Sequence, residues 1–519
     1  MKKKSIIIYA TLLVMSFSSC DKNFEEINTD PTKLTEANFR YNYLFTSAQL
    51  FAAGNFDGYS NGTWQSSLSY ASTMMQHLSS TNSWWYGDKY VYNEVYNSSF
   101  WQYQYSTAIK SIVDVINNIK ADENKKNFYN ISRIMKVWMF HRVTDIYGDV
   151  PYTEAGLGYE SGLVTPKYDK QEDIYMDMLK ELDEAAQQLD ASGNNDLETA
   201  DQFYNGDVAK WKKFAYSLML RLGMRLSKVD ATNAEAWVKK AVAGGVMESN
   251  DDNAILTQEA KGTHRESNGV GLQLRSREPS SYKVSKTFID FLRNNNDPRL
   301  KWMATIIEDT DNTEDMGDNT TSIQLGQPNG YDKSGATTDI SNAPNWPGNQ
   351  NKYSTVNRMT FSREDAPTFF LTYAETALLE AEAAQKNWIS GDAATFYADG
   401  VKAAMLQLNQ TGASLAESEA DAYVTAHPYA AANGLQMISE QYWVATFADW
   451  LETWANWRRT GFPVLTPVVY QGNTTGGTIP RRFTYPMDEA NVNPANYSSA
   501  SSSISGGDKM TSRVWWDKE

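Results

Sequence analysis

Residues 171–190 read QEDIYMDMLKELDEAAQQLD and decide the fold class. Apolar side chains recur there every three or four positions, and charged or amide side chains fill most of the positions between them. The apolar series is Ile174, Met178, Leu182, Ala185 and Leu189. This spacing places the apolar side chains on one face of an α-helix. The stretch therefore predicts an amphipathic helix that packs its apolar face against other helices.

The same periodicity recurs on both sides of this stretch. The predicted helices pair along the chain as 101–121 with 128–147, 171–191 with 208–228, and 367–388 with 391–410, and 436–459 follows. Asp207 is suited to cap one helix, and Pro367 suits the first turn of another. Strand patterns are few and short. We expect a mainly α fold of a single domain, in which helix pairs stack as in helical-repeat proteins, although a full tetratricopeptide signature is not found.

Long segments between the helices lack this periodicity. They are rich in Gly, Asn, Ser, Thr, Pro, Trp and Tyr, and they cover 54–100, 248–285, 309–362 and 462–519. Long irregular segments in a folded protein are usually functional or disordered. We expect the ligand-facing surface to lie on them.

Aromatic residues make up 13% of the chain, with 16 Trp, 30 Tyr and 20 Phe. In SSTNSWWYGDKY (79–90), two adjacent indoles cannot share one helix face, and NWPGN (345–349) is similarly loop-like. A flat ring stacks on a sugar's C–H face while polar neighbours bond its hydroxyls. The predicted ligand-binding residues are Trp84, Trp85, Tyr86, Asp88, Asn345 and Trp346, with Trp64 and Tyr331 as further candidates. The alternative is that individual rings fill the core beneath a loop.

The N-terminus has the layout of a secretory signal. Lys2 to Lys4 precede a mostly apolar run, Ile6 to Met15, that is too short to span a bilayer. Small residues then lead to Cys20, the single cysteine, as in lipoprotein processing. The alternative is an ordinary signal with a chance cysteine. The predicted organisation is a signal peptide at 1–19, a lipidated acidic tether at 20–40 and an α-helical domain at 41–519.

Charge and cysteine content exclude several classes of protein. The formal net charge of −16 disfavours binding to nucleic acid and to anionic lipid headgroups. If Cys20 is lipidated, the mature chain has no thiol for catalysis, for a disulfide or for a cysteine-ligated zinc site. We predict no catalytic residues, no cofactor and no nucleic-acid partner, and a protein held at the membrane by its lipid anchor.

Two charged clusters have both a structural and a functional interpretation. His141 and Asp145 have the residue types of an acid–base pair, but their place at a helix end and turn favours a structural role. Arg221 and Arg225 lie one helical turn apart, which favours partly buried ion pairs. The expected partners of these arginines are Glu375 and Glu382.

The acidic stretch EDTDNTEDMGD (308–318) offers the oxygen ligands that Ca²⁺ prefers. It does not match an EF-hand, because Glu314 stands where that loop needs glycine. A solvated loop is the simpler interpretation, and a Ca²⁺ site is a hypothesis.

Ten stretches in a fixed order resemble the SusD/RagB nutrient-binding lipoproteins, in the branch called SusD-like 2. Each stretch is weakly specific, and the ordered set is highly specific. They are FEEINTDP (24–31), DIYGDVPYTEA (145–155), PKYD (166–169), YNGD (204–207) followed by Trp211, SLMLRLGMR (217–225), DPRL (297–300), YAE (373–375), EAEA (380–383), ETWANWRRTGFP (452–463) and IPRRFTYP (479–486).

This resemblance implies a helical domain scaffolded by tetratricopeptide-like pairs, with loops and small strands on one side. It implies a lipid-anchored protein on the cell surface, at the outer membrane, that covers a SusC-type TonB-dependent porin. Such a protein binds an oligosaccharide, or in some relatives a peptide, and passes it inward without catalysis. Two other hypotheses are a surface glycoside hydrolase, which needs two carboxylates at a fixed separation, and a helical-repeat scaffold or adhesin that binds protein.

Overall fold

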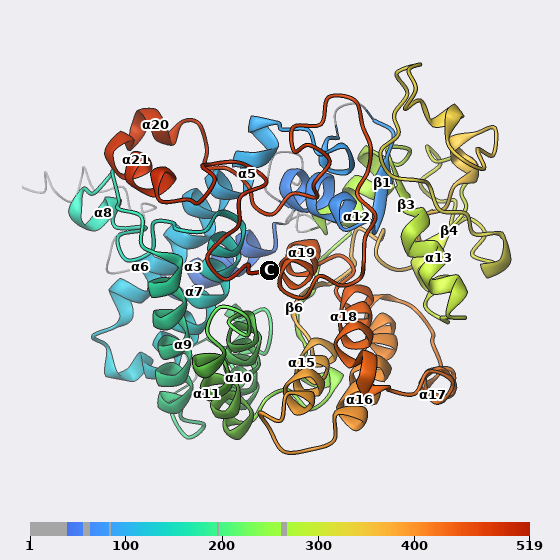
Figure 1. Cartoon of the computed structure of the whole chain (residues 1–519). Helices are drawn as coiled ribbons and strands as arrows, with labels where there is room; N and C mark the ends of the chain where they lie inside the picture. The colour runs from blue at the N-terminus through green and yellow to red at the C-terminus, as the bar shows by residue number, and fades with distance from the viewer. Residues whose placement is uncertain (1–38, 55–62, 83–84, 195–196, 261–266) are drawn as a thin grey trace, which may run out of the picture. The chain divides into compact units, whose positions relative to one another are not determined.

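Consecutive helices pack side by side in the computed structural model (Figure 1). The structure describes residues 39–54, 63–82, 85–194, 197–260 and 267–519. The predicted signal peptide, Cys20, most of the tether and Trp84 lie outside the described residues. The chain divides into residues 1–41 and residues 42–519, and the second unit holds the fold.

Helices account for most of the regular structure. The longer α-helices are α3 (Tyr41–Ala53), α5 (Glu94–Gln104), α6 (Lys110–Ile119), α7 (Lys126–Tyr147), α9 (Gln171–Gln188), α10 (Val208–Arg225), α11 (Ala231–Gly244), α13 (Lys286–Asn294), α15 (Tyr373–Gln385), α16 (Ala393–Leu406), α17 (Glu417–Ala426), α18 (Gly434–Ala445), α19 (Trp450–Thr460) and α21 (Pro494–Ser502). The shorter ones are α4 (Ser72–Met74), α8 (Gly158–Ser161), α12 (Gly269–Leu272), α14 (Leu300–Met303) and α20 (Glu489–Val492).

The helices form two neighbouring groups, as Figure 1 shows. In the first group α7 packs on α6 and α9, α9 packs on α10, and α10 packs on α11. In the second, α15 packs on α16 and α18, and α10 contacts α15 to join the groups. The apolar stripe of α9 is buried as predicted, and Asp207 caps α10 by accepting from the Ala209 amide at 2.9 Å. The predicted mainly α fold is confirmed.

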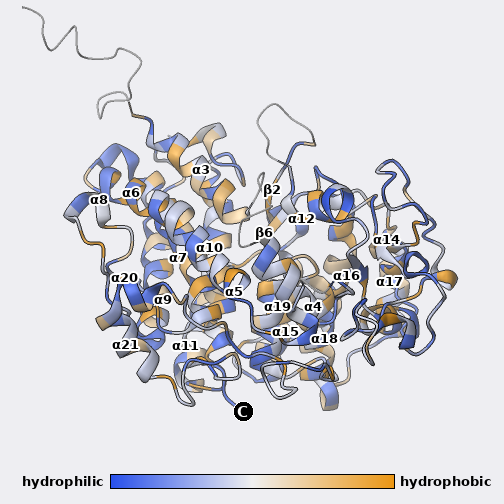
Figure 2. Cartoon of the chain, turned by 90° about the horizontal axis from the view of Figure 1, so that it is seen from above, coloured by the Kyte–Doolittle hydropathy of each residue, from blue (hydrophilic) through white to orange (hydrophobic). Residues whose placement is uncertain are grey.

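Three short antiparallel strand pairs support the loops. They are β1 (Leu78–Ser80) with β3 (Tyr282–Val284), β2 (Ala254–Leu256) with β6 (Thr368–Leu371), and β4 (Ala304–Thr305) with β5 (Thr355–Val356). Most helices carry both apolar and hydrophilic residues, in keeping with one buried face each (Figure 2). Among the described residues, none of the helices is both long and apolar enough to cross a bilayer.

Two predicted helices differ from the observed ones. The helix predicted to start at Pro367 begins only at Tyr373, because residues 368–371 pair with β2 as strand β6. Thr372 then caps α15 through the Glu375 amide. The predicted helix at 436–459 is two helices, α18 and α19, and Ala448 between them has a φ of 78°.

Part of the predicted loop at 54–100 is helical. Thr63–Ala71 forms a π-helical stretch that runs into α4. Its buried side chains include Trp64, Leu68 and Ala71. Their spacing of three to four positions is helical, but the Ser and Gln residues between them are also buried, so the polarity contrast that marks an amphipathic helix is missing.

Candidate functional site

A small aromatic cluster forms within the long segment between β4 and β5. Its buried members are Ile340, Ala343 and Tyr353, and the partly buried Leu325, Tyr331 and Trp346 pack against them. The Trp346 ring lies 5.9 Å from the Tyr353 ring, centroid to centroid. We call the half-buried pair Tyr331 and Trp346 the aromatic platform. The structure thus brings together two of the predicted binding residues that lie 15 positions apart in sequence.

The turn that presents Trp346 is built by its neighbours. Asn345 and Gly348 have φ values of 60° and 83°, in the left-handed region that Asn and Gly tolerate best. The Trp346 amide donates to the Ala343 carbonyl at 3.1 Å and closes the turn. Asn345 is exposed beside the indole, so its amide is available to a ligand that stacks on the ring.

Side-chain amides hold this segment against strand β1 and the residue that follows it. Gln350 Nε2 donates to Thr81 Oγ1 at 2.6 Å, and Asn329 Nδ2 donates to the Leu78 carbonyl at 2.7 Å. The platform segment therefore lies against residues 78–81, a few positions before the predicted Tyr86. These buried hydrogen bonds fix the position of the platform on the rigid part of the molecule.

A third segment, 466–474, adjoins the platform. The Tyr470 hydroxyl donates to Asp332 Oδ2 at 2.8 Å. Burial, this hydrogen bond, and the charges of Asp332, Asp88 and Tyr86 raise the pKa of Tyr470 to about 12. Tyr86 is half-buried and belongs to this neighbourhood. The surface around the platform thus includes two further tyrosines.

Three predicted binding residues are buried instead, and the prediction is wrong for them. Trp85 is 2% exposed and Trp64 is 7% exposed, and their rings meet edge to face at 4.8 Å. Asp88 is fully buried, where it pairs with Lys89 at 2.9 Å and accepts from the Ser80 amide. The helical stretch Thr63–Ala71 places Trp64 in contact with Trp85. These indoles therefore fill the core and present no face to a ligand.

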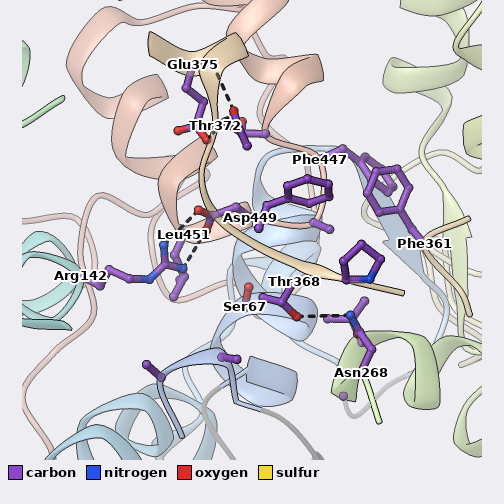
Figure 3. Close-up of a pocket in the computed structure, with 18 of the residues that line it drawn as sticks. Ser67, Arg142, Asn268, Phe361, Thr368, Thr372, Glu375, Phe447, Asp449 and Leu451 are labelled. Carbon is purple, nitrogen blue, oxygen red and sulfur yellow. Dashed lines mark hydrogen bonds and ion pairs between the residues drawn. The ribbon is translucent and has the colours of Figure 1, made fainter. Parts of the chain in front are cut away.

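A separate cavity opens between the two helix groups (Figure 3). It holds about 890 Å³ including the solvent at its mouth. Its apolar walls include Trp138, Phe361 and Phe447, and the last two rings meet at 5.0 Å. Nothing in the sequence indicated this cavity, because its walls come from segments far apart in the chain.

The charged groups of this cavity are already paired. Arg142 donates to both carboxylate oxygens of Asp449, at 2.7 and 3.1 Å. Asp449 lies in the short connection between α18 and α19, and this interruption of the helix lets its side chain reach Arg142. Glu375, at another wall, pairs with Arg221. The carboxylates drawn in Figure 3 therefore serve as ion-pair partners.

His141 and Asp145 take part in a buried charge cluster with Glu452. The possible ligand atoms of these three side chains lie within 4.8 Å of one another. Arg225, however, binds Glu452 at 2.6 Å and Asp145 at 3.4 Å. Burial alone raises the pKa of Glu452, but Arg225 and Arg221 outweigh it and hold that pKa at about 2. Asp145 and Glu452 are therefore ion-pair partners of Arg225 within the core, and His141 is buried beside them without a hydrogen-bond partner among the described residues.

The ion-pair partners were predicted in part. Arg221 pairs with Glu375, as expected. Arg225 pairs with Glu452, and Glu382 pairs with Arg459 at 2.6 Å.

The acidic loop 308–318 surrounds a guanidinium. Arg358 donates to the carbonyl oxygens of Thr310, Asn312 and Asp315, at 2.6 to 2.9 Å. Oxygens that a bound cation needs are thus directed at an arginine of the chain itself. The Ca²⁺ hypothesis stays a prediction.

Comparisons with known proteins give a consistent result. The model of a family described as "SusD-like_2: Starch-binding associating with outer membrane" matches residues 40–486. A solved structure titled "chitin-binding protein" has 36% identity and a TM-score of 0.80, over 92% of this chain and 100% of that chain. A Bacteroidetes SusD-like structure has 26% identity and a TM-score of 0.80, over 93% and 100%. A chitin-binding SusD homolog from Flavobacterium johnsoniae has 24% identity and a TM-score of 0.74, over 92% and 99%. No match is found among curated proteins.

Proposed function

Since this chain belongs to the SusD-like family of starch-binding proteins that associate with the outer membrane, we propose that it binds an oligosaccharide at the cell surface. It delivers this ligand to a SusC-type TonB-dependent porin and leaves the glycosidic bonds intact. The aromatic platform, formed by Tyr331 and Trp346, carries this proposal.

The chemistry of the platform suits a sugar. Half-buried rings offer flat apolar faces on a rigid support, and a pyranose presents a C–H face of the same size. Asn345 is exposed beside Trp346, and an amide both donates to and accepts from hydroxyl groups. A combination of apolar faces with a few oriented polar groups is typical of small-ligand sites.

The relative titled "chitin-binding protein" narrows the choice of ligand. At 36% identity over 92% of this chain, it favours a chitin-derived oligosaccharide as the first ligand to test. The N-acetyl groups of such a ligand add a methyl group for ring contacts and an amide for hydrogen bonds with Asn345.

The paired carboxylates support binding without hydrolysis. A glycosidase needs one carboxyl group as acid and a second as nucleophile or base, both free to reach the substrate. Asp449 and Glu375 at the cavity of Figure 3 are engaged by Arg142 and Arg221. Each of these carboxylates is thus directed at an arginine of the chain itself.

The decisive test is binding of chitotetraose to residues 21–519, measured by titration calorimetry. We expect Trp346→Ala to weaken binding by about tenfold or more, equal to 1.4 kcal/mol, because the ring supplies most of the apolar contact. Trp237 is the matched control: it is a half-buried tryptophan on α11 that stacks with Lys240. Trp237→Ala should bind chitotetraose like the wild type.

Two results would contradict the proposal. One is an unchanged affinity in a folded Trp346→Ala protein. The other is shortening of chitotetraose by the wild type, detected by chromatography, when a single carboxylate substitution abolishes it. Circular dichroism melting of each variant separates lost binding from lost folding.

A further inference from the structure

A second open groove lies beside strand pair β2–β6 and the start of α10. It encloses about 1390 Å³ including open solvent. Figure 2 shows β2 and β6 next to each other, and α10 contacts β6. The groove is lined mainly by amide side chains, with one ion pair and one half-buried ring. The lining residues that matter are Gln202, Phe203, Asn253, Gln258, Arg363 and Gln410. We call it the Gln258 groove.

Gln258 is the feature that indicates a ligand. It is 4% exposed, and its Oε1 accepts from Thr368 Oγ1 at 2.9 Å. Gln258 lines the groove, and its buried Nε2 has no hydrogen-bond partner in the described part of the chain. A buried amide nitrogen that bonds to nothing is unfavourable. A ligand acceptor that reached this nitrogen from the groove would supply the missing hydrogen bond.

The rest of the groove is polar and already ordered. Asn253 Nδ2 donates to Gln410 Oε1 at 2.9 Å, and Gln410 Nε2 donates to the Asn250 carbonyl at 3.0 Å. These bonds hold two amides in fixed orientations while leaving them further capacity, because each amide group has two donors and two lone pairs.

The charges of the groove cancel. Arg363 binds both oxygens of Asp365, at 2.6 and 2.8 Å. Lys210 Nζ donates a hydrogen bond to the backbone carbonyl of Asp251. Two cations and two anions leave no net charge for a charged ligand to neutralise. A neutral ligand with many hydroxyl or amide groups is the best match.

An aromatic ring completes the groove. Phe203 is half-buried, and its ring lies 4.5 Å from the Phe370 ring and 5.8 Å from the Trp211 ring. These contacts fix Phe203 from the core side, so the part of its ring that reaches the groove is held rigidly. Rigid rings next to oriented amides are suited to a pyranose.

We propose that the Gln258 groove is a second saccharide-binding site, separate from the aromatic platform. The two sites share no residue: the groove is carried by β2, β6 and α10, and the platform by the segment between β4 and β5. The inference deepens the proposed function, on which it rests for the class of ligand, but it does not require a ligand at the platform. Two sites would let the protein bind one long oligosaccharide, or two oligosaccharides, at the same time.

Crystals soaked in chitotetraose, together with calorimetric titrations, test this inference. We expect sugar density in the groove within hydrogen-bond distance of Gln258 Nε2. In solution, Trp346→Ala should retain one site, and adding Gln258→Leu should weaken that site by about fivefold or more. Gln258→Leu keeps the size of the side chain and removes its donors. Gln187→Leu, on the exposed face of α9, is the matched control and should change nothing.

Each result decides between the sites. Sugar at the platform with only water in the groove overturns the second site and leaves the proposed function standing. Density in the groove with no effect of Gln258→Leu in solution is binding at crystal concentration only, and it also overturns the second site. Sugar in the groove but not at the platform upholds the inference and contradicts the platform. No chitotetraose at either site overturns both for this ligand.

Discussion

Glu380 and Glu382 lie two residues apart on α15 and have opposite environments. Glu380 is buried without a cationic partner, and burial together with Asp399 and Glu248 raises its pKa to about 7. Glu382 is also buried, but Arg459 binds it at 2.6 Å and lowers its pKa. Two identical side chains on one helix therefore contribute to stability with opposite signs at neutral pH.

The pH dependence of stability follows from these pKa values. A carboxyl group whose pKa is raised in the folded state destabilises the protein once the pH exceeds its unfolded pKa. This penalty grows from about pH 4.5 and is complete above pH 7, where the shift corresponds to about 3 kcal/mol. We therefore expect Glu380→Gln to raise the free energy of unfolding at pH 8 and to change it little at pH 4.5. Urea unfolding at both pH values measures the difference.

The matched control is Glu382→Gln, which should act in the opposite direction. The pKa of Glu382 is depressed, so its stabilising effect is present above pH 4.5 and is lost as the pH falls. Glu382→Gln should lower stability at pH 8 and should do so less at low pH. If Glu380→Gln destabilises the protein at pH 8 as Glu382→Gln does, Glu380 has a partner in solution and the argument fails.

At the residue scale, residue type nominated candidate binding side chains but could not tell which of them are exposed. Trp346 was identified as a candidate and is half-buried on the surface, whereas Trp85 had the same profile and is 2% exposed. The difference arises from Trp64, 21 positions earlier, whose ring packs against Trp85. Tertiary contacts of this kind leave no periodic signal. Gln258 was missed for the same reason, because its hydrogen-bond partner Thr368 lies 110 positions away in the sequence.

At the scale of elements, periodicity located the helices and misjudged some of their ends. The stripe of α9 and the cap of α10 were predicted from local sequence and are confirmed. Residues 368–371 were assigned to a helix because Pro367 suits a first turn, but they pair with β2. A partner strand more than 110 positions away overrides local preference. The short strands that shape the Gln258 groove were therefore beyond local reasoning.

The acidic loop 308–318 depends on one side chain of another segment. Arg358 donates to three of its carbonyl oxygens, and the Ile306 and Asp318 backbones exchange hydrogen bonds at its base. We expect Arg358→Met to release the loop, because the three carbonyls lose their shared donor and the carboxylates then repel one another. Hydrogen exchange of the loop amides should accelerate by about tenfold or more, equal to 1.4 kcal/mol of lost protection.

Arg275→Met is the control for this loop. Arg275 donates to the Arg358 carbonyl at 3.3 Å, and no hydrogen bond joins it to residues 308–318. Its replacement should leave the exchange of the loop unchanged. Equal protection in wild type and Arg358→Met would show that the loop folds on its own. Added Ca²⁺ that restores protection to Arg358→Met would indicate that a cation can replace the guanidinium.

At the scale of the whole molecule, the helices supply the support and the segments between them carry most of the two proposed binding surfaces. The platform segment is held by amide hydrogen bonds to Leu78 and Thr81, and the Gln258 groove lies beside β2, β6 and α10. The ordered motifs predicted the family, which the comparisons confirm over residues 40–486. Neither proposed surface could be assembled from those motifs. Tyr204 and Asn205 of YNGD line the Gln258 groove, but the other lining residues of the groove and the whole platform lie outside the motifs.

We propose that attachment to the membrane rests on Cys20. Each CH₂ group of an acyl chain on this cysteine would contribute about 0.8 kcal/mol of binding free energy when it is buried in the bilayer. A protein with a net charge of −16 is not attracted to anionic headgroups. We expect the full chain, expressed in a Bacteroidetes host, to incorporate an alkynyl fatty acid and to fractionate with the outer membrane. Cys20→Ala should do neither.

The same variant separates anchoring from recognition. The helical unit begins at Asn42, 22 residues after the anchor, so Cys20→Ala should bind chitotetraose like the wild type. Detergent extracts of outer membranes should yield a TonB-dependent porin with the wild-type protein, because the tether confines both partners to one surface and raises their effective concentration. A Cys20→Ala protein that still sediments with the outer membrane and still carries the fatty-acid label would contradict the anchor. In that case contact with the porin or another surface protein, and not a lipid, would have to hold the acidic body at the cell surface.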